Sequence, residues 1–124
     1  MKVSDVMSRE ILTINKEARI RDTLDRMNEE GVGSLLVEDQ GKMIGIVTTY
    51  DILKLIGSEE FGDDVLVEDV MTPRLLVIDQ DLDVEEAAKK LADANIWRLP
   101  VVEKNEDKKE IVGILSARDI LRNY

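Results

Sequence analysis

The sequence contains neither cysteine nor histidine. Without cysteine the chain has no disulfide, no thiol nucleophile and no zinc–thiolate site. Without histidine it lacks the usual general base and the most common transition-metal ligand. Both absences disfavour enzyme chemistry. We therefore expect a protein that is not an enzyme, with no catalytic residues, no metal site and no resident cofactor.

Positive charge and long apolar runs are also scarce. The 17 lysines and arginines stand against 27 aspartates and glutamates, which gives a formal net charge of −10. This charge repels nucleic-acid phosphates and disfavours a sequence-independent DNA or RNA binder. No apolar run approaches the ~20 residues that span a bilayer, and no signal-peptide pattern opens the chain. We therefore expect a cytoplasmic protein without nucleic-acid or membrane partners.

The dominant pattern in the chain is an internal repeat. Residues 3–8 (VSDVMS) return as residues 67–72 (VEDVMT), and residues 45–53 (GIVTTYDIL) return as residues 113–121 (GILSARDIL). A repeat fixes the architecture before any single element is considered. It predicts two similar units related by a pseudo-two-fold axis, with paired clefts between them.

The repeat also predicts how the chain is divided. We expect a first repeat at 1–57, an acidic linker at 58–66 and a second repeat at 67–124. A unit of about 60 residues buries little surface, so the two repeats are expected to share one core. The second copy carries four extra residues, which we place in a polar hairpin loop at 104–110.

Hydrophobic periodicity predicts the same order of elements in both copies: strand, helix, strand, strand, helix, which is an α+β fold. Gly31 and Asn95 occupy matching positions where the first helices should end, because both residue types accept the left-handed conformation. Asp83, with Glu86 three residues later, predicts a side-chain cap. Arg19 holds the matching place in the first copy and is a poor cap, so a looser helix start is expected there.

The repeated motifs resemble those of the cystathionine-β-synthase (CBS) domain pair, also called a Bateman module. The resemblance rests on Asp-Val-Met at the head of each copy and on Gly-hydrophobic-x-Thr/Ser-x-x-Asp before each last helix. It covers essentially the whole chain. It implies a non-catalytic regulatory module that binds AMP, ADP, ATP or a related adenosyl ligand such as S-adenosylmethionine in clefts between the repeats.

Thr48 with Asp51, and Ser116 with Asp119, are the first residues to which the resemblance gives a role. It implies that the aspartates accept hydrogen bonds from ribose hydroxyls and that the hydroxyl residues lie beside a phosphate. A hydroxyl followed three residues later by a carboxylate is also a capping-box pattern, so both pairs could merely start helices. The preceding Gly45 and Gly113 admit two interpretations as well, either close approach to a ligand or a β-bulge.

Three further residues complete the predicted nucleotide-binding set: Ile96, Arg98 and Arg118. The resemblance implies that Arg98 lies near the phosphates, and the alternative is a salt bridge to a carboxylate. Arg118 is a second phosphate candidate, whereas its counterpart Tyr50 is not. The neighbouring Trp97 is expected to pack on the core or on another subunit rather than to hold a base.

The resemblance also implies that each cleft is shared across the repeats. Thr48 and Asp51 should then face 96–98, while Ser116 and Asp119 should face 32–34. The first cleft would contain a cation and the second would not, so the two should bind differently. We further expect a homodimer and a regulated partner protein. The alternatives are an interaction scaffold that has lost ligand binding and, less favoured, a carboxylate-based phosphohydrolase.

Overall fold

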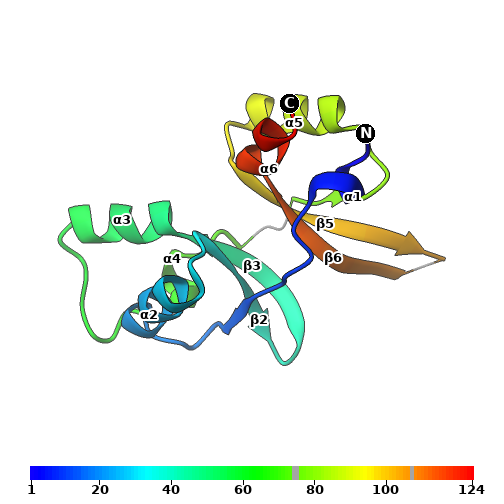
Figure 1. The fold of residues 1–124 in the computed structure, drawn as a ribbon. Coiled ribbons are helices and arrows are strands. Elements are labelled where there is room, and N and C mark those ends of the chain that lie inside the picture. The colour runs from blue at the N-terminus through cyan, green and yellow to red at the C-terminus, as the bar shows by residue number, and fades with distance from the viewer. Residues whose placement is uncertain (74–75, 107) are drawn as a thin grey trace. The chain divides into compact units, whose positions relative to one another are not determined.

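The computed structural model describes residues 1–73, 76–106 and 108–124. The chain forms two compact units whose boundaries differ from those of the sequence repeats (Figure 1). The first, here called the continuous unit, comprises Leu12–Leu75. The second, here called the split unit, comprises Met1–Ile11 together with Leu76–Tyr124. Each unit is described separately.

The continuous unit follows the predicted element order. Its three-stranded sheet has the order β1-β2-β3, with β1 parallel to β2 and β2 antiparallel to β3. The elements in chain order are β1 (Thr13–Asn15), α2 (Ile20–Glu30), β2 (Ser34–Asp39), β3 (Lys42–Thr48), α3 (Thr49–Gly57) and a short helix α4 (Val67–Val70).

The split unit repeats this arrangement with strands β4-β5-β6, of which β4 and β5 are parallel and β5 and β6 antiparallel. Its elements are α1 (Val3–Val6), β4 (Ile78–Asp79), α5 (Val84–Ala94), β5 (Arg98–Asn105), β6 (Lys108–Ser116) and α6 (Ala117–Arg122). The predicted α+β fold is thus confirmed in both copies. The one-turn helices α1 and α4 were not predicted from the sequence.

The opening motif of each repeat packs on the other repeat. In the split unit, Ser8 and Ile114 exchange two backbone hydrogen bonds of 2.9 Å each, which joins the start of the chain to β6 (Figure 1). In the continuous unit, Thr72 and Ile46 exchange the matching pair, at 2.9 and 3.1 Å. Both compact units are therefore completed by a segment from the neighbouring sequence repeat.

The repeated motif itself explains why these segments form a helical turn. The carboxylate of Asp5 accepts the Lys2 N–H at 2.8 Å, and that of Asp69 accepts the Leu66 N–H at 3.0 Å. These bonds satisfy donors at the helix start. One turn of helix then directs Val3 and Val67 inwards, where both are fully buried.

Most of the buried apolar side chains form two clusters, one in each unit. Each unit takes one segment from outside its own sequence repeat, 1–11 in the split unit and 58–75 in the continuous unit, and these are here called the exchanged segments. Each exchanged segment supplies one fully buried valine to its cluster, Val3 or Val67. The split-unit cluster contains Val3, Met7, Ile78, Val84, Ala87, Leu91, Leu99, Val101, Leu115 and Ile120. The continuous-unit cluster contains Ile20, Met27, Leu35, Val37, Val47, Ile52, Leu55 and Val67.

The four extra residues of the second copy lengthen its β-ribbon and not its loop. The last cross-strand pair is Asp39–Lys42 in the first copy and Asn105–Lys108 in the second, so two residues connect the strands in each. The placement of all four in a hairpin loop was therefore wrong. Added residues can extend an antiparallel ladder as long as they add equally to both strands.

The first long helix of each unit ends as predicted but begins differently. Gly31 and Asn95 follow α2 and α5 in the left-handed conformation, at φ of 67° and 54°. The Asp83 side chain makes no capping hydrogen bond, so that prediction was wrong. The Val84 N–H instead donates to the Met1 carbonyl at 2.9 Å, and the Ile20 N–H donates to the Val65 carbonyl at 3.3 Å.

The exchanged segments therefore supply one backbone acceptor to each of these helix starts. In the part of the chain that the structure describes, no helix is both long and apolar enough to cross a membrane.

Candidate functional site

The start of α3 is held by a reciprocal pair of hydrogen bonds. The Thr48 N–H donates to Oδ2 of Asp51 at 2.9 Å, and the Asp51 N–H donates to Oγ1 of Thr48 at 3.2 Å. The Thr48 hydroxyl also reaches the same Oδ2, at 3.1 Å. The capping-box interpretation is thus confirmed for this pair.

The start of α6 has the same arrangement. The Ser116 N–H donates to Oδ2 of Asp119 at 2.9 Å, and the Asp119 N–H donates to the Ser116 hydroxyl at 3.1 Å. Since both aspartates are half-buried next to the end of a strand, their orientation is fixed by the fold before any ligand arrives.

Capping uses only one oxygen of each carboxylate. Among the described residues, Oδ1 of Asp51 and Oδ1 of Asp119 accept no hydrogen bond from the protein. An ionised carboxylate has about four lone-pair sites over its two oxygens, so each aspartate retains acceptor capacity. The helix-capping role and a ligand-binding role can therefore coexist in the same side chain.

The segment before β2 or β5 lies beside these helix starts. The Thr49 N–H donates to the Gly33 carbonyl at 3.0 Å, and the Ala117 N–H donates to the Trp97 carbonyl at 2.8 Å. Ser34 pairs with Thr48 across the sheet. In the other unit Arg98 pairs with Ser116. Directly opposite residues have Cβ atoms about 4.5–5.5 Å apart on one face of the sheet.

The predicted site residues divide between the two units. Thr48 and Asp51 lie in the continuous unit; Ile96, Arg98, Ser116, Arg118 and Asp119 lie in the split unit. The register brings Arg98 to Ser116 of its own repeat, with Asp119 at the same helix start. Arg118, the second residue of α6, is exposed.

The structure bears on the alternatives that the sequence left open for the segment 96–98. Ile96 is half-buried and packs against the core of the split unit. Trp97 is 73% exposed, so it does not pack on the core, and its contact with another subunit stays a prediction. Arg98 is half-buried and makes no salt bridge to any described residue, so the salt-bridge interpretation is not supported there.

Gly45 and Gly113 have a role that neither sequence interpretation proposed. A Cβ on Gly45 would lie 2.5 Å from the Thr72 carbonyl oxygen, and one on Gly113 would lie 2.5 Å from that of Ser8. The glycines therefore allow the exchanged segments to approach. The bulge interpretation is close to correct. Gly45 pairs with Val37, and the register of the ladder shifts between Val37 and the next residue, Glu38. The sequence did contain a signal for this contact, because the glycine and the opening motif both occur once in each copy.

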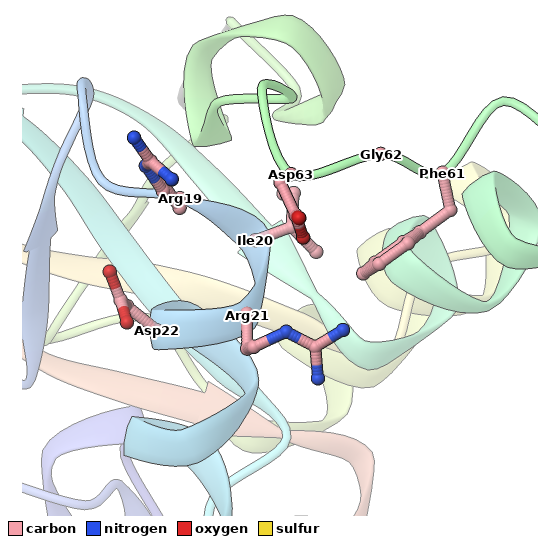
Figure 2. A pocket seen from close by; sticks show the side chains of 7 residues that line it. All are labelled: Arg19, Ile20, Arg21, Asp22, Phe61, Gly62 and Asp63. Carbon is pink, nitrogen blue, oxygen red and sulfur yellow. The ribbon is translucent and has the colours of Figure 1, made fainter.

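A cavity of about 330 Å³ lies at the start of α2 in the continuous unit. The Arg21 guanidinium carbon is 5.8 Å from the centre of the Phe61 ring at this cavity (Figure 2). None of the predicted nucleotide-binding residues belongs to it, and its two arginines are balanced by two aspartates. The lining residues are Arg19, Ile20, Arg21, Asp22, Phe61, Gly62 and Asp63.

Two α+β units of identical topology, each with a capped helix following its last strand, define a tandem-repeat module of the CBS type. A profile of the CBS domain family matches residues 3–58 and 67–124. The chain belongs to this family and contains two copies of the domain.

Several archaeal proteins are similar to the chain over nearly its whole length. An uncharacterized protein of Methanopyrus kandleri is 30% identical over 98% of the chain, which spans 62% of that protein. Another, of Methanocaldococcus jannaschii, is 31% identical over 99% of the chain and 44% of its own length. A homoserine O-acetyltransferase of Methanohalobium evestigatum is 31% identical over 97% of the chain, but only 23% of the enzyme is covered.

Solved structures of CBS domain pairs have the same fold. The CBS domain pair of protein MJ0100, in complex with 5′-methylthioadenosine and S-adenosyl-L-methionine, has a TM-score of 0.86 and is 27% identical, covering 99% of this chain and 94% of its own. CBSX2 in complex with AMP has a TM-score of 0.79 and is 30% identical, covering 98% and 94%. The chain spans less than two thirds of the first archaeal relatives described above.

Proposed function

We propose that this chain is a non-catalytic sensor module that binds an adenine nucleotide or a related adenosyl ligand. Binding would shift the packing of the module, and a regulated partner protein would respond to that change. The ligands named for CBSX2 and for MJ0100 support this choice, since all of them contain adenosine. The proposed ligand residues are Thr48, Asp51, Ile96, Arg98, Ser116, Arg118 and Asp119.

The observation that carries the proposal is the free acceptor on each capping aspartate. Capping orients Asp51 and Asp119 through Oδ2, while Oδ1 has no protein donor among the described residues. Adjacent ribose hydroxyls are a suitable pair of donors for a fixed, half-buried carboxylate. Because the helix start is already formed, little conformational entropy is lost when the ligand binds.

Replacing either aspartate by asparagine tests this role without removing the cap. In Asp51→Asn and Asp119→Asn, the amide oxygen can still accept the capping N–H, but the amide nitrogen cannot accept a hydroxyl. A hydrogen bond to a charged group contributes about 1.5–3 kcal/mol. We therefore expect the affinity of the affected unit for AMP or 5′-methylthioadenosine to fall by about 10- to 100-fold in calorimetric titrations.

Two matched controls are present in the same chain. Asp69→Asn and Asp5→Asn change carboxylates that also accept a helix-start N–H, in the continuous and the split unit respectively. Neither residue belongs to the proposed site, so ligand affinity should remain unchanged. Equal losses in the site variants and in these controls would contradict the ribose role.

The main alternative is an interaction scaffold without a small-molecule ligand. One observation favours it: the hydroxyl–carboxylate pairs satisfy each other as caps, so they need no ligand to explain their presence. Thermal unfolding with AMP, ADP, ATP, S-adenosylmethionine and 5′-methylthioadenosine separates the two. A ligand present at 100 times its Kd stabilises the folded state by about 2.7 kcal/mol, so an unchanged midpoint with every ligand would support the scaffold.

We also propose that the module forms a homodimer through apolar helix faces. In the continuous unit, Tyr50, Leu53 and Ile56 are 65%, 64% and 51% exposed and share one face of α3. Their spacing of three residues produces an apolar stripe. Exposed apolar surface of this kind commonly marks a protein interface.

Sedimentation velocity tests the dimer. The Leu53→Glu variant places a charge in the stripe, and desolvating that charge is costly, so the variant should sediment as a monomer. Leu76→Glu serves as the control, because Leu76 is similarly exposed, at 55%, but lies outside the helices. A dimer that persists in Leu53→Glu would exclude α3 as the interface.

A further inference from the structure

The β5–β6 ribbon of the split unit is longer than the matching β2–β3 ribbon of the continuous unit (Figure 1). The shorter ribbon ends at the cross-strand pair of Asp39 with Lys42, whereas the longer one continues for two further pairs. The added pairs are Lys104–Lys109 and Asn105–Lys108. Three of the four added residues are therefore lysines, in a chain whose formal net charge is −10.

Like charges lie directly opposite each other in the longer ribbon. Lys104 pairs with Lys109, and in the preceding pair Glu103 faces Glu110. Such like-charge pairs in an antiparallel ladder are destabilising. The last pair of the continuous unit combines an aspartate with a lysine instead. The longer ribbon therefore carries an electrostatic cost that the shorter ribbon does not have.

The lysine pair and the glutamate pair occupy different faces of the ribbon. Successive side chains of a strand point to opposite faces, so Lys104 and Lys109 share one face, while Lys108 lies on the face of the glutamates. Lys104 and Lys109 are exposed, and neither forms a salt bridge with a residue that the structure describes. One face of the ribbon thus presents two ammonium groups from directly opposite positions.

We infer that the face of Lys104 and Lys109 docks an acidic segment of a partner protein. A carboxylate placed between the two ammonium groups is attracted by both and offsets their mutual repulsion. The net charge of −10 repels an acidic segment from the protein as a whole, so this local pair decides where the segment is held. The inference rests on the proposed function for the existence of a regulated partner, and it adds the docking surface and the charge of that partner.

Protection of the ribbon edges is the other explanation for these lysines. Lysines on exposed strands prevent edge-to-edge pairing with another chain. That role needs a charge on each strand, but it does not need the same charge on both. A lysine opposite a glutamate would protect the edges equally well and would stabilise the ribbon. The like-charge arrangement therefore favours docking.

Octaglutamate is a suitable probe for this face, because it supplies carboxylates without any other recognition group. Amide chemical shifts recorded during a titration at about 0.01 M ionic strength, where the Debye length is about 30 Å, locate the bound peptide. The shifts should change in the β5–β6 ribbon, and the changes should disappear at about 1 M salt. No change at low salt, or changes centred elsewhere in the chain, would overturn the inference.

Charge reversal at single positions distinguishes the two faces of the ribbon. Lys104→Glu and Lys109→Glu should each weaken octaglutamate binding about fivefold or more, because a repulsion replaces an attraction. Lys108→Glu is the matched control, since it changes the charge equally on the other face, and it should weaken binding much less. Equal weakening in all three variants would overturn the inference.

Urea unfolding of the same variants shows whether the loss of binding is a loss of fold. Lys104→Glu should raise the unfolding midpoint, since it creates an opposite-charge pair with Lys109. A lowered midpoint would contradict the repulsion from which the inference starts. Self-association of Lys104→Glu in sedimentation velocity, with unchanged affinity for octaglutamate, would assign the lysines to edge protection and overturn the inference as well.

A single-stranded oligonucleotide serves as the second probe. Tighter binding of the oligonucleotide than of octaglutamate to the same lysines would overturn the choice of a protein partner. None of these measurements contains an adenosyl ligand, so a negative result leaves the proposed binding of adenosine compounds unaffected. Conversely, a protein that binds octaglutamate on this face but no adenosyl ligand would retain the docking surface and lose the proposed sensor function.

Discussion

Residues 12–75, produced as a separate fragment, should fold cooperatively, whereas residues 1–57 should not. The first fragment is the continuous unit and the second is the first sequence repeat. The structural difference is the segment 58–75. It supplies the fully buried Val67 to the core and pairs Thr72 with Ile46 at the edge of β3.

The small size of the unit explains why residues 1–57 should not fold cooperatively. Burying one valine contributes about 1.5–3 kcal/mol, and a core in a domain of fewer than about 70 residues rarely supplies more than 3–5 kcal/mol in total. Loss of Val67, together with the partly buried Val65, Val70 and Met71 that pack on the same cluster, should exceed that margin.

Urea unfolding followed by circular dichroism, with amide proton dispersion as a second measure, tests this prediction. The 12–57 fragment is the matched control, because it differs from 12–75 only by the exchanged segment. Addition of a peptide comprising residues 58–75 should restore structure to 12–57. A cooperative transition in 1–57 with the same midpoint as in 12–75 would contradict the exchange.

Adding a single methyl group at Gly45 or Gly113 should destabilise the protein strongly. A Cβ on Gly45 would lie 2.5 Å from a backbone oxygen of Thr72, and one on Gly113 would lie 2.5 Å from that of Ser8. Because backbone atoms in a hydrogen-bonded bridge cannot rotate away, the exchanged segment must move. We expect Gly45→Ala and Gly113→Ala each to lower the free energy of unfolding by about 2–3 kcal/mol.

Gly57→Ala is the matched control for both variants. A Cβ on Gly57 has no atom within 4 Å, and this last residue of α3 is exposed. Its substitution should be neutral or stabilise by up to about 1 kcal/mol, since alanine restricts the unfolded chain more than glycine does. Urea unfolding of the three variants provides the comparison. Equal stabilities for Gly45→Ala and Gly57→Ala would exclude a tight approach at β3.

Much of the local structure could be predicted from a few neighbouring residues. Gly31 and Asn95 end their helices as expected, because the left-handed conformation is a property of the residue itself. The capping boxes at Thr48 and Ser116 were one of the two interpretations drawn from the sequence, since both partners of each box lie within four residues. Asp83 shows where this reasoning fails, because its side chain makes no capping hydrogen bond, and a distant backbone carbonyl, that of Met1, accepts the Val84 N–H.

The candidate site combines features that follow from the repeat with others that depend on strand register. The hydroxyl–carboxylate pairs follow from the repeat. The neighbour of Arg98 depends on the register between β5 and β6, which places it opposite Ser116. For Trp97 the sequence left packing on the core or on another subunit open, and only the three-dimensional packing excludes the core, since the side chain is 73% exposed.

The sequence by itself determined the repeat, the order of the elements and the family, because these depend on periodicity and on motifs within each copy. Only the tertiary structure decided which copy receives each opening motif. Both copies have a glycine at the matching strand position, Gly45 or Gly113, so the sequence alone does not say on which copy an opening motif packs. The hydrogen bonds of Ser8 with Ile114 and of Thr72 with Ile46 make this assignment, and they join residues that lie far apart in the chain.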